Sequence, residues 1–146
     1  MSQDQRARLL IVEDNPSIRA MLAFFLRATY DLELVGRFDD ALHAAAHRGF
    51  DLFLLDINLG EPRTGIDLLG ALRQMPAYAA TPVVACTAKE PGSKEHLLAS
   101  GFDAYIGKPF TEEELLDTLH TVLAASCLSG QAASDRQRVL DEASLE

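Results

Sequence analysis

In the segment Leu9-Leu10-Ile11-Val12-Glu13-Asp14-Asn15-Pro16, an apolar run is followed by two acidic residues and a helix start. A continuous apolar run of this length is typical of a strand buried on both faces of a parallel sheet. Asn15 and Pro16 supply an N-cap and a first-turn proline, so a helix is expected to follow at once. The run Leu52-Phe53-Leu54-Leu55 has the same character and leads directly into Asp56.

Strand-like and helix-like segments alternate along the rest of the chain. Strands are predicted over residues 9–12, 32–35, 52–55, 82–86 and 104–106, and helices after Pro16, after Asp39 or Asp40 as the cap, and over 65–75, 93–100 and 112–125. Thr111-Glu112-Glu113-Glu114 is a capping box that opens the last helix. Regular alternation of strand and helix predicts an α/β fold with a parallel sheet covered on both faces.

Composition narrows the class of protein. The 146 residues are 48% hydrophobic and 24% charged, which is ordinary for a globular domain, and the formal net charge is −9. This acidity argues against direct nucleic-acid binding and against an anionic membrane surface as partner. The start of the chain is unlike a signal peptide, and no apolar run approaches the ~18 residues of a membrane span. Cys86 and Cys127 have no metal-ligand spacing, so a reducing, cytoplasmic location is expected.

The composition changes near the C-terminus. From residue 126 to 146 the chain is rich in Ser, Gly, Gln and Ala and carries few large apolar side chains. We therefore expect one domain over residues 8–125, followed by a tail that is either a linker or the start of a helix leading to an output domain.

Polar side chains follow the predicted strands, and the carboxyl ends of parallel strands meet at one edge of the sheet. Glu13 and Asp14 follow the first strand, Asp56 the third, Thr87 the fourth and Lys108 the fifth. Three clustered carboxylates repel one another, and Mg²⁺ with its preference for oxygen ligands relieves that repulsion. A carboxylate such as that of Asp56 can also accept a phosphoryl group, whose oxygens the ammonium and the hydroxyl would then bind.

Four motifs on successive strand ends carry a resemblance to a known family. They are Leu10-Ile11-Val12-Glu13-Asp14-Asn15, Leu54-Leu55-Asp56-Ile57-Asn58-Leu59, Cys86-Thr87-Ala88 and Tyr105-Ile106-Gly107-Lys108-Pro109-Phe110. In order and spacing they resemble the receiver domain of two-component response regulators. The resemblance implies a flavodoxin-like (βα)5 three-layer sandwich whose five parallel strands lie in the order 2-1-3-4-5.

The resemblance also implies a role for each matching residue. Asp56 would take a phosphoryl group from a sensor histidine kinase or phosphotransfer protein, and the chain would catalyse only its own phosphorylation and dephosphorylation. Glu13, Asp14, Asp56 and the main-chain carbonyl of Asn58 would bind Mg²⁺. Lys108 would pair with the phosphorylated aspartate, and Thr87 and Tyr105 would form the switch that changes affinity for an output domain or protein. A phosphorylation-dependent homodimer is a further possibility that the family allows.

Two features depart from the common family pattern. The loop Leu59-Gly60-Glu61-Pro62-Arg63-Thr64-Gly65 is about one residue longer and lacks a proline directly after the apolar residue, and the last helix has no Arg or Lys. Elsewhere, His43 and His47 have metal-ligand spacing on a helix, but without a third ligand a solvated pair is the simpler interpretation.

Two other functions have to be set against the signalling switch. Phosphatases of the haloacid dehalogenase type need a second carboxylate two residues after the nucleophile, and this chain has Asn58 there. A constitutive interaction module built on a receiver fold would usually lack one of the acidic residues or the lysine, and all of them are present. A dinucleotide-binding fold is excluded because no Gly-rich loop follows the first strand.

Overall fold

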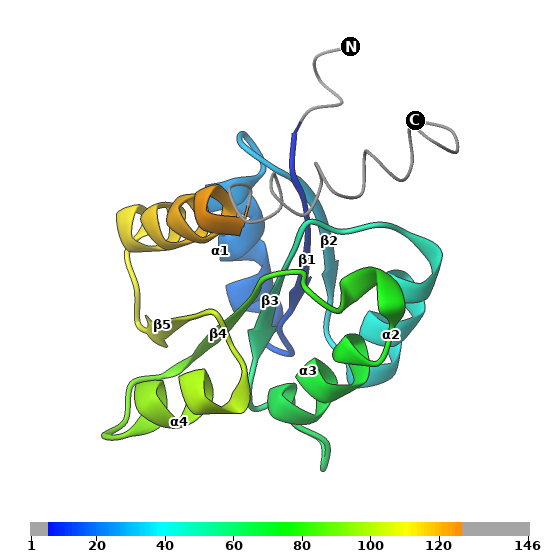
Figure 1. The fold of residues 1–146 in the computed structure, drawn as a ribbon. Coiled ribbons are helices and arrows are strands. Elements are labelled where there is room, and N and C mark those ends of the chain that lie inside the picture. The colour runs from blue at the N-terminus through cyan, green and yellow to red at the C-terminus, as the bar shows by residue number, and fades with distance from the viewer. Residues whose placement is uncertain (1–5, 127–146) are drawn as a thin grey trace.

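A computed structural model describes residues 6–126 of the chain, and its centre is a parallel sheet of five strands (Figure 1). The strands lie in the order β2-β1-β3-β4-β5, as predicted. Their bounds are Arg8–Val12 for β1, Asp31–Val35 for β2, Leu52–Asp56 for β3, Val83–Ala88 for β4 and Ala104–Lys108 for β5. The predicted tail over residues 126–146 lies outside the described residues except for Ser126.

Helices cover both faces of this sheet and complete a three-layer α/β sandwich. Their bounds are Pro16–Leu26 for α1, Phe38–His47 for α2, Gly65–Arg73 for α3 and Ser93–Ser100 for α4, with a short 3-10 helix, η2, at Pro76–Tyr78. A C-terminal helix occupies residues 112–126. Figure 1 shows α1 and this C-terminal helix, drawn in orange, on one side of the sheet and α2 and α3 on the other. No helix within the described range is long and apolar enough to cross a membrane.

Alternate residues of β1 and β3 pack into two separate hydrophobic clusters. Leu10 and Phe53 face the cluster formed with α2, α3 and α4. Leu9 and Leu54 face the cluster formed with α1 and the C-terminal helix. All five residues of β3 are buried, which explains why its sequence is a continuous apolar run rather than an alternating one. Burying one such side chain stabilises the fold by about 1.5–3 kcal/mol.

The predicted helix caps at Asn15 and Thr111 are confirmed. The Asn15 side-chain oxygen accepts hydrogen bonds from the amides of Ser17 and Ile18, at 2.8 and 3.2 Å. In the capping box, the Glu114 amide donates to the Thr111 hydroxyl at 3.0 Å, and the Thr111 amide donates to the Glu114 carboxylate at 2.9 Å. These short-range interactions fix where α1 and the C-terminal helix begin.

The predicted start of the second helix is wrong. Helix α2 begins at Phe38, ahead of Asp39 and Asp40, and its N-cap residue Arg37 makes no side-chain cap. The Phe38 amide instead donates to the Glu61 carboxylate at 3.0 Å. Because this acceptor comes from a loop more than twenty residues away, local sequence could not indicate it. Other predicted ends differ less: β4 begins after Pro82, and α3 ends at Arg73, two residues before the predicted end.

Candidate functional site

Three carboxylates meet where strands β1 and β3 end. Glu13 and Asp14 follow β1, Asp56 is the last residue of β3, and one carboxylate oxygen from each lies within 4.8 Å of the others. Glu13 and Asp56 are only 2% and 4% exposed, whereas Asp14 is exposed. The carboxylates lie in the wall of a cavity of about 460 Å³, which is lined by Glu13, Asp14, Asn15, Ile18, Asp56, Asn58, Thr87, Ala88, Glu90 and Lys108.

Lys108 supplies the positive charge of this cavity. It is the last residue of the edge strand β5, and its Nζ donates to Glu13 Oε1 at 2.8 Å and to Asp56 Oδ2 at 3.2 Å. The sequence predicted the pairing with Asp56, but the shorter contact with Glu13 was not predicted. Burial alone would lower the pKa of Lys108, yet the hydrogen bond to Glu13 and the charges of both carboxylates raise it overall. The lysine therefore remains an ammonium at neutral pH.

The environment of Asp56 favours its protonated form. Burial first, and then the negative charge of Glu13, raise the pKa of Asp56 to about 7, although Lys108 acts in the opposite direction. One ammonium therefore does not balance three carboxylates of which two are buried, and a hard divalent cation would. The carboxylate oxygens of Glu13, Asp14 and Asp56 fit Mg²⁺, and these side chains would hold it.

The loop after Asp56 lies close to the carboxylates. The Asn58 amide donates to Asp56 Oδ1 at 3.3 Å, and the Gly60 amide donates to the Asn58 side-chain oxygen at 3.0 Å. Gly60 has a φ of +71°, which favours glycine, and a Cβ there would lie 3.0 Å from Asp14 Oδ2. A Cβ on Gly65 would overlap the main-chain oxygen of Asp56. Both glycines let the loop backbone approach the acidic cluster.

Arg19 fixes the main chain of the acidic pair Glu13 and Asp14, a role that was not predicted from the sequence. Its Nη1 donates to the main-chain oxygens of Glu13 at 2.7 Å and Asp14 at 3.2 Å. The Asn15 amide in turn donates to Glu13 Oε2 at 3.1 Å. The available signal was a basic residue one turn into the helix that follows the acidic pair, on the side facing the strand end. These contacts fix the backbone from which the two acidic side chains project.

The two residues predicted to form a switch lie in different places. Thr87 is half-buried on β4 and lines the cavity beside the carboxylates. Tyr105 is half-buried on β5 outside that cavity, and its hydroxyl donates to the main-chain oxygen of Ala88 at 3.2 Å. It lines a neighbouring hollow with Lys89 and Lys94. The tyrosine is thus held next to the residue that follows Thr87, without contributing to the wall of the site.

The other candidate ligands are not part of this site. The rings of His43 and His47 stack at 4.2 Å between centroids on α2. Over residues 6–126 the acidic cluster is the only group of three metal-ligating side chains, so no third ligand joins the histidines. Cys86 is buried, and burial raises the pKa of its thiol to about 12. Cys127 lies outside the described residues.

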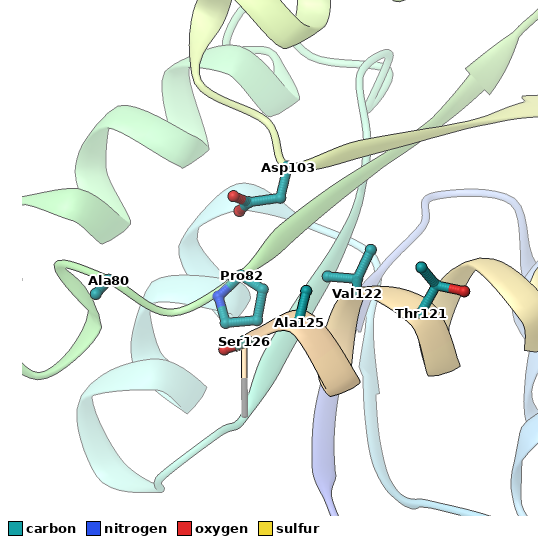
Figure 2. A pocket seen from close by; sticks show the side chains of 7 residues that line it. All are labelled: Ala80, Pro82, Asp103, Thr121, Val122, Ala125 and Ser126. Atoms are coloured by element: carbon teal, nitrogen blue, oxygen red, sulfur yellow. The ribbon is translucent and has the colours of Figure 1, made fainter. Parts of the chain in front are cut away.

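A second hollow, of about 340 Å³, lies at the opposite end of β4 and β5 (Figure 2). Its one charged side chain is Asp103, which already accepts a hydrogen bond from the Val83 amide at 2.8 Å and pairs with Arg73 at 3.5 Å. The lining residues are Ala80, Pro82, Asp103, Thr121, Val122, Ala125 and Ser126. This hollow therefore lacks the cluster of charged side chains found at the carboxyl ends of the strands.

Comparison with known proteins gives a consistent result. The family model described as the response regulator receiver domain matches residues 9–120. The chain is 39% identical over 113 residues to the DNA-binding response regulator MtrA of Mycolicibacterium smegmatis, covering 76% of this chain and 48% of that one. It spans between 14% and 48% of the length of the first curated relatives that it matches.

Two solved structures agree with the fold. The chemotaxis response regulator CheY4 of Vibrio cholerae superposes with a TM-score of 0.74 at 34% identity, covering 80% of this chain and 98% of that one. The receiver domain of the sensor histidine kinase PA1611 of Pseudomonas aeruginosa gives 0.74 at 26% identity, covering 82% and 98%. With four strand-end motifs gathered around one cavity and a family match over most of its length, the chain belongs to the response regulator receiver domain family of two-component systems.

Proposed function

We propose that Asp56 is the phosphoacceptor of this receiver domain. The observation that carries the proposal is the position of its carboxylate, which is buried at the end of β3, paired with Lys108 and within reach of two further carboxylates. Its Oδ1 accepts the Asn58 amide while its Oδ2 accepts from Lys108. Both oxygens are therefore held in fixed directions at the wall of an open cavity, as an in-line displacement requires.

The donor would be the phosphohistidine of a sensor kinase or of a phosphotransfer protein. An Asp56 oxygen attacks phosphorus, a new P–O bond forms, the P–N bond to the donor histidine breaks, and the imidazole leaves with the electron pair. Glu13, Asp14, Asp56 and the Asn58 main-chain carbonyl would hold Mg²⁺, which when bound neutralises the carboxylates and the phosphoryl oxygens. The structure of the PA1611 receiver domain contains a magnesium ion coordinated in its active-site cleft, which supports this choice of metal.

Lys108 and Thr87 would bind the oxygens of the transferred group. The ammonium already lies 3.2 Å from Asp56 Oδ2, and the Thr87 hydroxyl lines the same cavity. Charge-assisted hydrogen bonds of this kind stabilise a phosphoryl group more than neutral ones do. Movement of Thr87 toward the phosphoryl group would vacate space beside Ala88, to which the Tyr105 hydroxyl is bonded. Phosphorylation would in this way reach Tyr105 and the surface it shares with Lys89 and Lys94.

We further propose the bounds of the domain, its location and the partner to which it transmits its state. The receiver domain would comprise residues 8–125, work in the cytoplasm and transmit its state to an output domain or protein. A phosphorylated homodimer would be one form of that output. We also propose that the domain catalyses only its own phosphorylation and dephosphorylation.

The test uses a small phosphodonor, so it needs no cognate kinase. The native protein is incubated with acetyl phosphate and MgCl₂, and intact mass spectrometry is expected to show one added phosphoryl group. Asp56→Asn should abolish the adduct, and EDTA should prevent it in the native protein. An adduct that persists in Asp56→Asn would contradict the assignment of the phosphoacceptor. If the native protein takes no phosphoryl group, a constitutive interaction module becomes the better account.

A further inference from the structure

The inner part of the loop that connects β3 to α3, residues 57–64, is fixed by contacts with its surroundings. The first residue of the loop is linked to the start of α3, because the Gly65 amide donates to the Ile57 main-chain oxygen at 2.9 Å. Leu59 is 4% exposed and belongs to the core cluster under α2 and α3. Gly60 lies beside the Asp14 carboxylate. The inner part of the loop is therefore placed by the core and lies against the acidic site.

The outer part of the same loop is bound to the first turn of α2. Glu61 accepts the Phe38 amide at 3.0 Å, and its side chain is only 10% exposed. Arg63 pairs with Asp39 at 3.1 Å and with Glu61 at 3.3 Å, and its guanidinium carbon lies 4.0 Å from the centre of the Phe38 ring. We call these four residues the α2 clamp.

The physical chemistry of the α2 clamp favours a fixed contact. A carboxylate at a helix N-terminus satisfies an orphan amide and interacts favourably with the helix dipole. An arginine over an aromatic face adds a cation–π contact. The N-cap residue of α2, Arg37, gives no side-chain cap, so Glu61 replaces a cap that the helix lacks locally. Glu61 and Arg63 also fall in the stretch where this chain departs from the common family pattern.

We infer that Glu61 and Arg63 are positioning residues for the metal site. By fixing the outer loop to α2, they keep the Gly60 backbone next to Asp14 and Asn58 in the wall of the cavity, so that the affinity for Mg²⁺ depends on a contact outside the cavity. The inference rests on the proposed function, because it assumes that this site binds Mg²⁺. A loop that is already ordered loses less conformational entropy when its carbonyl becomes a ligand.

The experiment compares three variants of the whole chain. Glu61→Ala removes the acceptor for the Phe38 amide, whereas Glu61→Gln keeps a side-chain oxygen at the same place. Asp103→Ala is the matched control, because Asp103 also accepts an amide hydrogen bond and pairs with an arginine, but at the far end of β4 and β5 (Figure 2). Mg²⁺ affinity is measured by calorimetric titration with MgCl₂. Amide hydrogen exchange at Phe38 and Gly60 is measured by NMR in EDTA.

We expect Glu61→Ala to weaken Mg²⁺ binding by about tenfold, the lower end of the effect of outer-shell partners on metal affinity. Exchange at the Phe38 and Gly60 amides should become faster in the metal-free protein. Glu61→Gln should recover most of the affinity. Asp103→Ala should lower the thermal midpoint and leave Mg²⁺ affinity unchanged.

A purely structural role for the clamp would give a different pattern. Glu61→Ala would then lower the thermal midpoint as Asp103→Ala does, with Mg²⁺ affinity equal to that of the native protein, and this result would overturn the inference. Unchanged exchange at Gly60 would overturn it as well. Failure of the proposed function gives a different result from failure of the inference alone. The native protein itself would then not bind Mg²⁺, and the inference would be overturned together with the proposed function.

Discussion

Replacing Asp56 by asparagine is expected to stabilise the metal-free protein at and above neutral pH. The carboxyl group is 4% exposed, and burial together with the charge of Glu13 raises its pKa from 3.8 to about 7. A group whose pKa is raised in the folded state binds more protons there than in the unfolded state. Its contribution to stability is therefore complete below about pH 3.8 and is lost as the pH rises through about 7.

The size of the effect follows from the two pKa values. At about 1.36 kcal/mol for each pH unit between them, ionisation of Asp56 costs the native state on the order of 4 kcal/mol by neutral pH. Asparagine avoids this cost, but it has one acceptor oxygen where Asp56 has two, so either the Asn58 amide or Lys108 Nζ loses its acceptor and part of the gain is offset. We therefore expect Asp56→Asn to unfold with a free energy about 2 kcal/mol above that of the native protein at pH 8.

Urea denaturation in EDTA at a series of pH values between 4.5 and 8 provides the measurement. The difference in the free energy of unfolding between Asp56→Asn and the native protein should grow from pH 4.5 to about 7 and level off by pH 8. Asp117→Asn makes the same chemical change on the exposed face of the C-terminal helix and controls for the loss of one surface charge. Adding MgCl₂ should stabilise the native protein at pH 8 and reduce the difference, because a ligand that binds only the folded state raises its stability.

The reasoning would be refuted by a difference that stays constant with pH. A constant difference would mean that Asp56 has the same proton affinity in the folded and unfolded chains. Its burial beside Glu13 would then carry no electrostatic cost for MgCl₂ to relieve.

Three further perturbations have defined outcomes. Lys108→Ala leaves two buried carboxylates without their cation and should destabilise the metal-free protein by about 3 kcal/mol in urea denaturation, with partial recovery in MgCl₂. If the variant were as stable as the native protein in EDTA, the assigned pairing would be contradicted. Gly65→Ala places a methyl group on the Asp56 main-chain oxygen and should lower the free energy of unfolding by about 1–3 kcal/mol, measured by thermal denaturation. In the control Gly70→Ala the new methyl group meets nothing within 4 Å, so the free energy of unfolding should stay the same or rise by about 0.5–1 kcal/mol. Tyr78→Phe removes the hydroxyl that bonds to main-chain oxygens at the end of α2 and should lower the free energy of unfolding by about 1 kcal/mol.

Features set by local patterns could be predicted from the sequence. The apolar runs of β1 and β3 predicted strands covered on both faces, because only such a strand can be apolar throughout. The order of the strands was implied by the family resemblance. Once the strands were known to be parallel, Glu13, Asp14, Asp56, Thr87 and Lys108 had to share one edge, and all five line the same cavity. Caps made within a few residues, at Asn15 and Thr111, were equally readable.

Features set by contacts between distant segments could not be predicted in this way. The start of α2 depends on Glu61, and the backbone of the acidic pair depends on Arg19. The shorter contact of Lys108 with Glu13 joins the ends of two different strands, which no single motif encodes. The position of Tyr105 outside the cavity likewise depends on the twist and spacing of two strands, and the motif that contains it indicates only the strand.

The place of Lys108 at the end of β5 has a consequence for association between molecules. β5 forms one border of the sheet, where unpaired backbone groups can template the addition of a foreign strand. The ammonium reaches past β4 to carboxylates at the ends of β3 and β1, so it ties this border strand to the middle of the sheet by charge. Loss of Lys108 would remove this tie and leave β5 held only by its pairing with β4 and by its helices. We therefore expect that loss to favour edge-to-edge aggregation.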